Sequence, residues 1–427
     1  MKTKWVKLEG MPYPCDAWTN ITPKITNMLP RKLHNQKNHP LWLLKQRIYR
    51  HLDHQSIGLG PRYTLVDDLS PVVTCKQNFD SLLVPQDHVS RLPKDTYYIN
   101  EHTLLRSHTS AHQNELLASG LNAFLVAGDV YRRDDIDRTH YPAFHQMEGV
   151  RLFTADQLFR TAIDPSGCLE LLDPREKIQL ERPMQSDQLS PDKQPCHTYE
   201  TLNRLEFELK SSLEDLARKL FGQAVKMRWV DAYFPFTHPS WELEICTLIG
   251  DSQEEQWMET LGCGIMRQEI LLKNGVHNKV GYAFGLGLER WAMHLYRIPD
   301  IRLFWSQDSG FLSQFQVEDV DQDIVFKPIS VYPQLPMDIS FWLPSDNAAK
   351  GKAFARDWYD IIREIAGDLV EQVHLVDTFT HPKTGRLSHC YRIIYRHHSK
   401  SLTMDEVRPI HQQMGSLAAE RLGVSIR

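Results

Sequence analysis

Apolar residues recur at helical spacing along two long segments of the chain. Residues 40–54, PLWLLKQRIYRHLDH, begin with a proline, whose fixed backbone angle suits the first turn of a helix. The segment TYETLNRLEFELKSSLEDLARKLFG is amphipathic over its whole length and stops at Gly222, a residue type that commonly ends helices. Both segments are predicted to be helices, and a further helix is predicted from about Ser110.

Other segments have the shorter period of β-strands. AFLVAGDVYRRD and FHQMEGVRLF are predicted to be two strands, separated by the polar loop DDIDRTHYPA. VKMRWVDAYFPF, WELEICTLI and QWMETLGCGI predict further strands. GYAFGLGLERWAMHLYRI predicts a glycine-rich turn that leads into a helix.

The pattern restarts near Val325, where strand, helix, strand, strand and helix follow one another. This order is typical of the ferredoxin-like split βαβ fold, which is often closed by one more short strand. We therefore expect an α+β protein, with a main domain at 39–322 and a ferredoxin-like domain at 326–427. A hinge between them is expected near 322–326.

Two segments lie outside these predicted elements. Residues 1–38 are polar and are interrupted by four prolines, so an extended N-terminal arm is expected. Residues 164–198 lose all periodicity and are rich in Pro, Asp, Gln and Ser, which predicts an exposed insertion.

Composition limits the class of protein and the number of domains, but it says little about the chemistry. The chain has 427 residues, 41% of them hydrophobic and 24% charged, as is ordinary for a globular protein of two or three domains. No apolar run approaches the roughly 18 residues of a membrane span. The seven cysteines contain no C-x-x-C pair, which argues against a disulfide framework or a zinc site and favours a reducing compartment. The net charge of −5 argues weakly against bulk nucleic-acid binding, although Val325–Arg427 holds 13 Lys and Arg against 11 Asp and Glu.

The densest chemistry lies in GDVYRRDDIDRTHYPAFHQMEG, Gly128 to Gly149. Alternation along a strand puts Arg132 and Arg133 on opposite faces, so one of them can point into a cleft and clamp a phosphate with its planar fork. On the second strand Phe144, Gln146 and Glu148 share a face that offers a stacking plane, an amide and a carboxylate. The alternative is that Phe144 belongs to the core and that the two polar side chains pair with the arginines.

Three shorter motifs are individually weak. GLGLER ends in Arg290, either a second phosphate ligand or part of a helix-packing turn, and it matches neither a P-loop nor a dinucleotide fingerprint. Phe234 and Phe236 lie two residues apart in YFPFTHPS, and they either cup an aromatic ligand or build core. RSHTSAHQ contains Ser110, either a helix cap or one of several polar groups facing a small zwitterion.

Together these motifs resemble those of the class II aminoacyl-tRNA synthetases. YRRD…FHQMEG and the later FGLGLER resemble motifs 2 and 3 of that class, and the helix from Pro40 with NFDSLLVPQDH resembles the motif 1 region. TSAHQ, YFPFTHPS and LGCGI narrow the resemblance to the phenylalanyl-tRNA synthetases. YPQLPMDISFWLP and THPKTGRLSHCYRIIYR are similar to the anticodon-binding domain of the single-chain organellar form. The resemblance covers nearly the whole chain from about Thr22. It implies a catalytic core built on an antiparallel sheet with helices, followed by a ferredoxin-like anticodon-binding domain.

The resemblance also implies a reaction and a role for each residue. In this family the carboxylate of phenylalanine attacks the α-phosphate of ATP, and the phenylalanyl group then passes to the 2′-OH of the 3′-terminal adenosine of tRNA. Arg132 would contact the α-phosphate and the attacking carboxylate, while Arg290 would reach the γ-phosphate and cover the face of adenine opposite Phe144. Thr139, His140, Tyr141 and Glu259 complete the expected ATP site. The expected amino-acid site comprises His108, Ser110, Ala111, His112, Gln113, Gln146, Met147 and Glu148 near the amino end, and Phe234, Phe236, Ala283 and Phe284 around the ring.

The same resemblance implies the partners. Mg²⁺ is expected with ATP, held more by the nucleotide than by protein ligands. L-phenylalanine and tRNA(Phe) are the other substrates, and Arg392 and Arg396, on one face of a predicted strand, are candidate tRNA contacts. A monomer in the mitochondrial matrix is expected, although the N-terminus shows no presequence pattern.

Two other functions fit parts of the sequence. A synthetase-like paralogue that does not aminoacylate would typically lack an active-site arginine or the amino-acid pocket, and both are present here. A synthetase for another amino acid is disfavoured by the apolar Phe234 and Phe236 pair, since tyrosine would need a buried partner for its hydroxyl.

Overall fold

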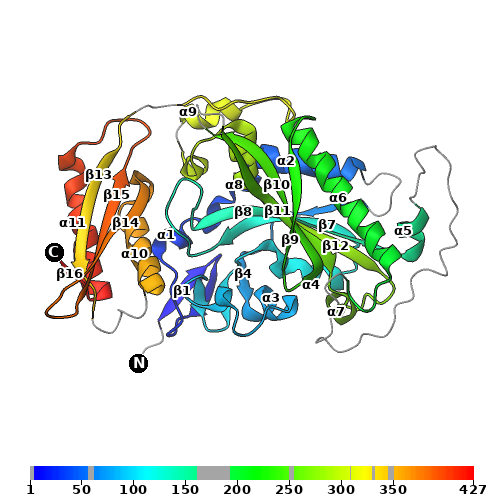
Figure 1. Ribbon diagram of the computed structural model, residues 1–427, viewed down its shortest axis with the longest axis horizontal. Helices are drawn as coiled ribbons and strands as arrows, with labels where there is room; N and C mark the ends of the chain where they lie inside the picture. The colour runs from blue at the N-terminus through cyan, green and yellow to red at the C-terminus, as the bar shows by residue number, and fades with distance from the viewer. Residues whose placement is uncertain are drawn as a thin grey trace.

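The computed structural model describes residues 4–55, 62–160, 193–249, 254–307, 309–328, 332–344 and 351–427. Two bodies with separate hydrophobic cores are present. In Figure 1 the C-terminal one runs from yellow at β13 to red at the C-terminus. Each combines helices with a mainly antiparallel sheet, which confirms the α+β class. No helix among the described residues is long and apolar enough to cross a membrane.

The first body is organised around a seven-stranded sheet of order β3-β7-β8-β12-β11-β10-β9. β3 runs parallel to β7, and every other neighbouring pair is antiparallel. The strands are β3 (Thr64–Val66), β7 (Ala123–Tyr131), β8 (Ala143–Phe153), β9 (Met227–Ala232), β10 (Thr237–Ile249), β11 (Glu254–Met266) and β12 (Val280–Gly287). The predicted pair of strands around the loop at 134–142 is therefore confirmed, and it lies in the middle of the sheet.

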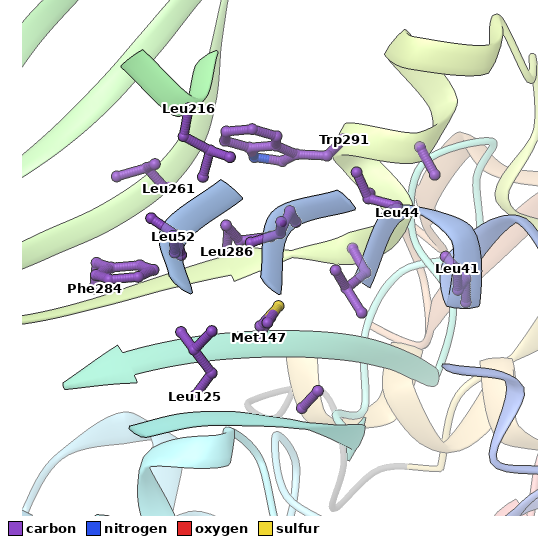
Figure 2. Close-up of a cluster of buried hydrophobic side chains, with 14 of the residues drawn as sticks. Leu41, Leu44, Leu52, Leu125, Met147, Leu216, Leu261, Phe284, Leu286 and Trp291 are labelled. Atoms are coloured by element: carbon purple, nitrogen blue, oxygen red, sulfur yellow. The ribbon is translucent and has the colours of Figure 1, made fainter. Parts of the chain in front are cut away.

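Three helices cover one face of this sheet and bury the main core. They are α2 (Pro40–Gln55), α6 (Tyr199–Phe221) and α8 (Leu288–Tyr296), and the first two match the helices predicted from periodicity. In Figure 2, Leu41, Leu44 and Leu52 of α2, Leu216 of α6 and Trp291 of α8 meet Leu125, Met147, Leu261, Phe284 and Leu286 of the strands. This layer fixes which face of β8, β11 and β12 remains for a ligand.

Smaller elements pack against the opposite face and the edges. A three-stranded sheet contains β4 (Val72–Thr74), β6 (Thr103–Leu105) and β5 (Tyr98–Asn100) in that order. The helix expected from about Ser110 begins later, because a 3₁₀ turn at Thr109–His112 precedes it. The short helices are α3 (Cys75–Asn78), α4 (Gln113–Ala118), α5 (Ala155–Arg160), α7 (Gln268–Lys273) and α9 (Ser309–Leu312).

The glycine-rich segment expected as a turn is the buried strand β12. Gly281 lies so close to the neighbouring strand that a Cβ there would be 2.4 Å from the carbonyl oxygen of Arg151. Glycine usually weakens a strand, but here it permits the close approach of two central strands. The predicted turn was wrong because glycine content was given more weight than the alternating apolar residues, whereas the helix predicted after it is confirmed as α8.

The N-terminal segment is folded rather than extended. A hairpin contains β1 (Trp5–Leu8) and β2 (Met11–Pro14), and α1 (Pro23–Thr26) begins after Thr22, whose side chain accepts a hydrogen bond from Ile25 N. Ile25, Met28, Leu29 and Leu33 are buried in the main core. Prolines shorten the helices here, but these apolar side chains still fold the segment onto the domain.

The exposed insertion expected at 164–198 can be compared with the structure only at residues 193–198, since residues 161–192 lie outside the described ranges. Gln194, Cys196 and His197 are buried. The Gln194 amide donates to the carbonyls of His238 and Met266, and its oxygen accepts from Gln268 N. These described residues are therefore part of the domain, contrary to the expectation.

The C-terminal body is the βαββαβ fold that the sequence predicts, including the closing short strand. Its sheet has the order β14-β15-β13-β16 and packs against two helices. The elements are β13 (Leu335–Trp342), α10 (Gly351–Ile365), β14 (Val370–Thr380), β15 (Leu387–Tyr395), α11 (Met404–Leu422) and β16 (Ser425–Ile426). The precise domain limits and the hinge near 322–326 stay predictions.

The C-terminal body contacts the loop between β7 and β8. Arg133 Nε donates to Asp360 at 2.9 Å, and the Tyr141 hydroxyl donates to Asp368 at 2.8 Å. Arg138 Nε donates to the buried Glu371 at 2.9 Å. The loop that follows Arg132 is thus held from the side of the C-terminal domain.

Candidate active site

A cavity of about 440 Å³ opens on the sheet face opposite the helices in Figure 2. β8, β11 and β12 form its floor, and the segments at 107–110 and 233–237 form its walls. The sequence-predicted residues that line it are His108, Ser110, Arg132, Gln146, Glu148, Phe234, Phe236, Glu259, Ala283 and Phe284. Residues far apart in the chain are therefore brought together as the motifs indicated.

One end of the cavity is aromatic. The rings of Phe234 and Phe236 lie 5.9 Å apart with planes 15° from parallel, so both present a similar orientation to the cavity. Gly262 on β11 permits this arrangement, since a Cβ there would be 2.7 Å from the Phe234 ring. Ala283 faces the cavity, whereas the Phe284 ring belongs to the core on the other side of β12 and only borders the cavity. A planar apolar group fits this end.

The other end holds a buried carboxylate. Glu148 is 4% exposed, accepts from Gln113 Nε2 at 3.1 Å and from Thr109 Oγ1 at 3.4 Å. Burial raises the pKa of Glu148 to about 7, although hydrogen bonds from Ser110, Thr109 and Gln113 oppose that rise. No cationic side chain pairs with Glu148 among the described residues, so an ammonium group of a ligand is a suitable partner.

The His108 ring lines the cavity 6.3 Å from the Phe236 ring, and it is uncharged at neutral pH. Burial, together with the charge of Arg132, lowers its pKa to about 3. A neutral imidazole can donate or accept a hydrogen bond there without repelling a cationic ligand.

Arg132 supplies the positive charge of the cavity. Its Nε donates to the Ser107 carbonyl at 2.8 Å, and its guanidinium lies 5.1 Å from the centre of the Phe144 ring. Burial lowers its pKa, and no carboxylate pairs with it among the described residues. Arg133 points the other way, toward Asp357 and Asp360, as strand alternation predicts. The two terminal nitrogens of Arg132 remain able to bind an oxyanion.

A more open part of the site lies where β12 leads into α8. Arg290 Nη1 donates to the Glu259 carbonyl at 3.2 Å and lies 3.9 Å from the Glu259 carboxylate. Added Cβ atoms at Gly285 and Gly287 would meet nothing within 4 Å, so there is free space beside these two residues. A flat ligand can approach the backbone closely there.

Several predicted residues lie outside the cavity. Met147 is fully buried in the main core because it alternates with Gln146 and Glu148. Ala111 packs in a separate apolar cluster, and the His112 ring contacts Glu115 and Arg106. Gln113 supports Glu148 from behind without lining the cavity.

Thr139, His140 and Tyr141 also lie away from the cavity. Asp137 accepts hydrogen bonds from Thr139 and His140, which raises the pKa of His140. The Tyr141 ring stacks on Trp305 at 5.6 Å, and its hydroxyl binds Asp368 of the C-terminal domain. In this structure the loop is held by local and interdomain contacts.

Sequence reasoning missed some residues of the site. Thr109 and Cys263 line the cavity, and their positions beside Ser110 and Gly262 were the available signals. Glu289, which makes two hydrogen bonds to His145, was treated only as a helix residue. Nothing in a single sequence pairs residues 144 positions apart.

Two domain families match the chain. The class II core domain of tRNA synthetases (F) matches residues 25–159 and 203–315, and the ferredoxin-fold anticodon binding domain matches residues 330–427. The chain is 50% identical to a probable mitochondrial phenylalanine–tRNA ligase of Drosophila melanogaster, over 99% of this chain and 92% of that protein. It is 50% identical to the mitochondrial phenylalanine–tRNA ligase of Mus musculus, over 99% and 89%. The corresponding Saccharomyces cerevisiae protein is 38% identical, over 100% and 96%.

Proposed function

The chain belongs to the phenylalanine–tRNA ligases of class II, and on that premise we propose how its cavity performs the reaction. Phenylalanine lies with its ring between Phe234, Phe236 and Ala283 and with its ammonium group at Glu148. The observation that carries this orientation is the single buried carboxylate opposite a pair of stacked rings. A zwitterion with an aromatic side chain matches both ends of the cavity.

In the first step the phenylalanine carboxylate attacks the α-phosphate of ATP. A bond forms between a carboxylate oxygen and phosphorus, and the bond to the leaving pyrophosphate breaks. Arg132 lines the same cavity, and in our proposal it binds both the carboxylate and the α-phosphate. Its charge stabilises the negative charge that develops on the phosphoryl oxygens, and the hydrogen bond from its Nε to the Ser107 carbonyl holds the guanidinium in place.

ATP occupies the more open part of the site. Adenine stacks between Phe144 and Arg290, and the space beside Gly285 and Gly287 admits the nucleotide. The Glu259 carboxylate, bordering this space, approaches the adenosine or its metal. In the second step the phenylalanyl group passes to the 3′-terminal adenosine of tRNA, with loss of AMP.

A divalent metal is implied for ATP, and we assign Mg²⁺. Glu242 and Glu259 are neighbouring carboxylates on β10 and β11, and burial together with the charges of Glu259 and Glu244 raises the pKa of Glu242. A cation would relieve this repulsion. We propose that the ion is bound mainly by ATP oxygens.

Phenylalanine-dependent ATP–pyrophosphate exchange tests this assignment. We expect exchange with phenylalanine, much weaker exchange with tyrosine, and none with small or charged amino acids. Exchange driven by another amino acid would assign the cavity to a different substrate. Absence of exchange with all twenty amino acids would favour a synthetase-like paralogue that does not aminoacylate.

Ala283→Gly is expected to widen the apolar end of the cavity. Ala283 is 4% exposed and lines the same cavity as the rings of Phe234 and Phe236. Removing its methyl group should admit phenylalanine analogues with a para substituent while leaving activation of phenylalanine within a few fold. The measurement is pyrophosphate exchange with para-chlorophenylalanine. If the variant kept the wild-type preference for phenylalanine over this analogue, the para carbon of the bound phenylalanine ring would not lie at Ala283.

For tRNA, we propose that the open face of the C-terminal sheet binds the anticodon loop. Arg392 and Arg396 stay predicted contacts, but Arg392 makes two hydrogen bonds to Asp338 at 2.8 and 2.7 Å.

At the other end of this face Trp342 and Phe379 have ring centres 6.1 Å apart. The guanidinium of Arg427 lies over both rings, at 5.4 and 5.6 Å, and that of Arg386 lies 5.5 Å from Trp342. Aromatic planes flanked by arginines are typical of surfaces that stack single-stranded bases.

Trp342→Ala is expected to raise the KM for tRNA by roughly 10-fold, since stacking of one base contributes about 1–3 kcal/mol. Pyrophosphate exchange should be unchanged because it needs no tRNA. Arg392→Ala serves as the comparison on the same face. A larger rise in tRNA KM for Arg392→Ala than for Trp342→Ala would move the RNA site to the Arg392 end.

The mitochondrial names of the relatives support a mitochondrial location, and we propose the matrix, which fractionation would test.

We also propose that the protein is a monomer. α2 corresponds to the region that resembles motif 1, and Leu41, Leu43, Leu44, Ile48 and Leu52 of this helix are all 0% exposed within the single chain. Light scattering that showed two chains per particle would contradict the monomer.

A further inference from the structure

A buried pair of hydrogen-bonded side chains joins the strand that carries Phe144 to the helix that carries Arg290. The Glu289 carboxylate accepts from the backbone N–H of His145 at 2.8 Å and from the His145 ring Nδ1 at 2.7 Å. His145 is 0% and Glu289 2% exposed. Because a carboxylate only accepts, Nδ1 carries the proton in this pair.

The pair lies where the sheet loses a strand. β12 pairs with β8 as far as Gly287 opposite Gln146, and the chain then turns into α8. The next backbone N–H along β8 is that of His145, and the Glu289 carboxylate binds it where the strand has ended. Glu289 thereby ties the first turn of α8 to one position of β8, and a carboxylate is favourable at a helix N-terminus.

The neighbours of this pair are the two residues assigned to adenine. Phe144 precedes His145 on β8 and points to the opposite side of the strand, where its ring lies 5.1 Å from the Arg132 guanidinium, while Arg290 follows Glu289 on α8. The His145 ring is itself fixed by packing against His34 at 5.1 Å and Trp305 at 5.8 Å between ring centres. Movement of α8 along β8 would therefore change the separation of Phe144 and Arg290.

Stability alone gives little reason to bury these two polar side chains at this point. Taking two polar groups out of water offsets most of their attraction, and well-packed apolar residues often stabilise a core as well or better. What such a pair adds is one defined relative position, because either hydrogen bond is lost if the helix shifts by a fraction of an ångström. This argument favours a role in geometry.

We propose that Glu289 and His145 are positioning residues for ATP, which set the gap between Phe144 and Arg290. The proposal rests on the proposed function, since it assumes that adenine lies in that gap. It assigns no contact with the substrate to either residue. In this role the length of the side chain at position 289 matters more than its charge. An uncharged side chain of the same length should therefore still position α8 on β8.

A substitution series at Glu289 separates reach from charge. Glu289→Gln keeps the length and can accept from the backbone N–H of His145, so we expect a KM for ATP within about threefold of the wild type. Glu289→Asp keeps the charge but is one methylene shorter, and we expect its KM for ATP to rise roughly 10–100-fold, the range for losing hydrogen bonds to a buried charged group. The KM for phenylalanine should be unchanged in both variants in pyrophosphate exchange. Both changes are small enough that folding is readily verified by thermal unfolding.

Arg47→Ala is the matched control for a general loosening of α8. The Arg47 guanidinium lies over Tyr296 at the far end of α8, and Nε donates to the Val320 carbonyl. This variant should unfold at a lower temperature and keep the wild-type KM for ATP. If Arg47→Ala raised that KM as much as Glu289→Asp, the pair would be merely structural.

Two other outcomes would overturn the proposal. A larger effect for Glu289→Gln than for Glu289→Asp would show that charge rather than reach matters, and parallel rises in both KM values would show a disturbance of the whole site. Arg290→Ala distinguishes failure of the underlying assignment. An unchanged KM for ATP in that variant would remove adenine from this gap altogether, whereas a raised KM with normal Glu289 variants would reject only the positioning role.

Discussion

Arg132→Ala is expected to lower phenylalanine-dependent pyrophosphate exchange by roughly 10³-fold, which is the effect of removing a preorganised donor from a transition-state oxyanion. The guanidinium is held by Ser107 and Phe144, and it has no carboxylate partner among the described residues. Its charge is therefore available to the phosphoryl group and to the attacking carboxylate. The loss should appear mainly in kcat, because the interaction strengthens as charge develops.

Arg133→Ala is the control for this experiment, since it removes the same side chain one residue along the strand. Arg133 lies on the other face and pairs with Asp357 and Asp360 of the C-terminal domain. Exchange should stay within a few fold of the wild type in this variant. Equal losses in the two variants would mean that the loop after β7, and not the Arg132 guanidinium, controls the rate.

The same pair of arginines shows how far the sequence alone predicts the site. Period-two alternation correctly placed Arg132 and Arg133 on opposite faces, and Phe144, Gln146 and Glu148 on one face. Alternation does not say which of the two faces the cavity, because that depends on which side α2, α6 and α8 cover. The resemblance indicated Arg132, and Arg132 lines the cavity in the structure.

Met147 and Tyr141 were placed in the site by resemblance, and the structure puts both elsewhere. Alternation alone would have put Met147 in the core, where it is fully buried. Tyr141 could not have been placed from the sequence, since its position depends on Asp368, a residue 227 positions away in another domain. Local sequence patterns do not predict contacts between distant segments of the chain.

Glu148 gives the second large effect. Glu148→Gln is expected to lower kcat/KM for phenylalanine by roughly 10²-fold, since a hydrogen bond between charged groups contributes about 1.5–3 kcal/mol. The loss should appear mainly as a higher KM for phenylalanine, because the ammonium group does not react. Glu115→Gln is the control, since Glu115 is a carboxylate on the neighbouring helix α4 that binds His112 outside the cavity.

The pH dependence of the same constant tests whether the ionised carboxylate is the binding form. Burial raises the pKa of Glu148 to about 7, so the free enzyme holds it mostly neutral below that pH and mostly ionised above it. Only the ionised form attracts an ammonium group, and kcat/KM for phenylalanine should therefore rise with pH up to about 7 and then level off. Glu148→Gln cannot titrate, so its profile should lack this rise. A rise that persisted near pH 7 in Glu148→Gln would assign the titration to another group, and would leave the ammonium group of the substrate without its proposed partner.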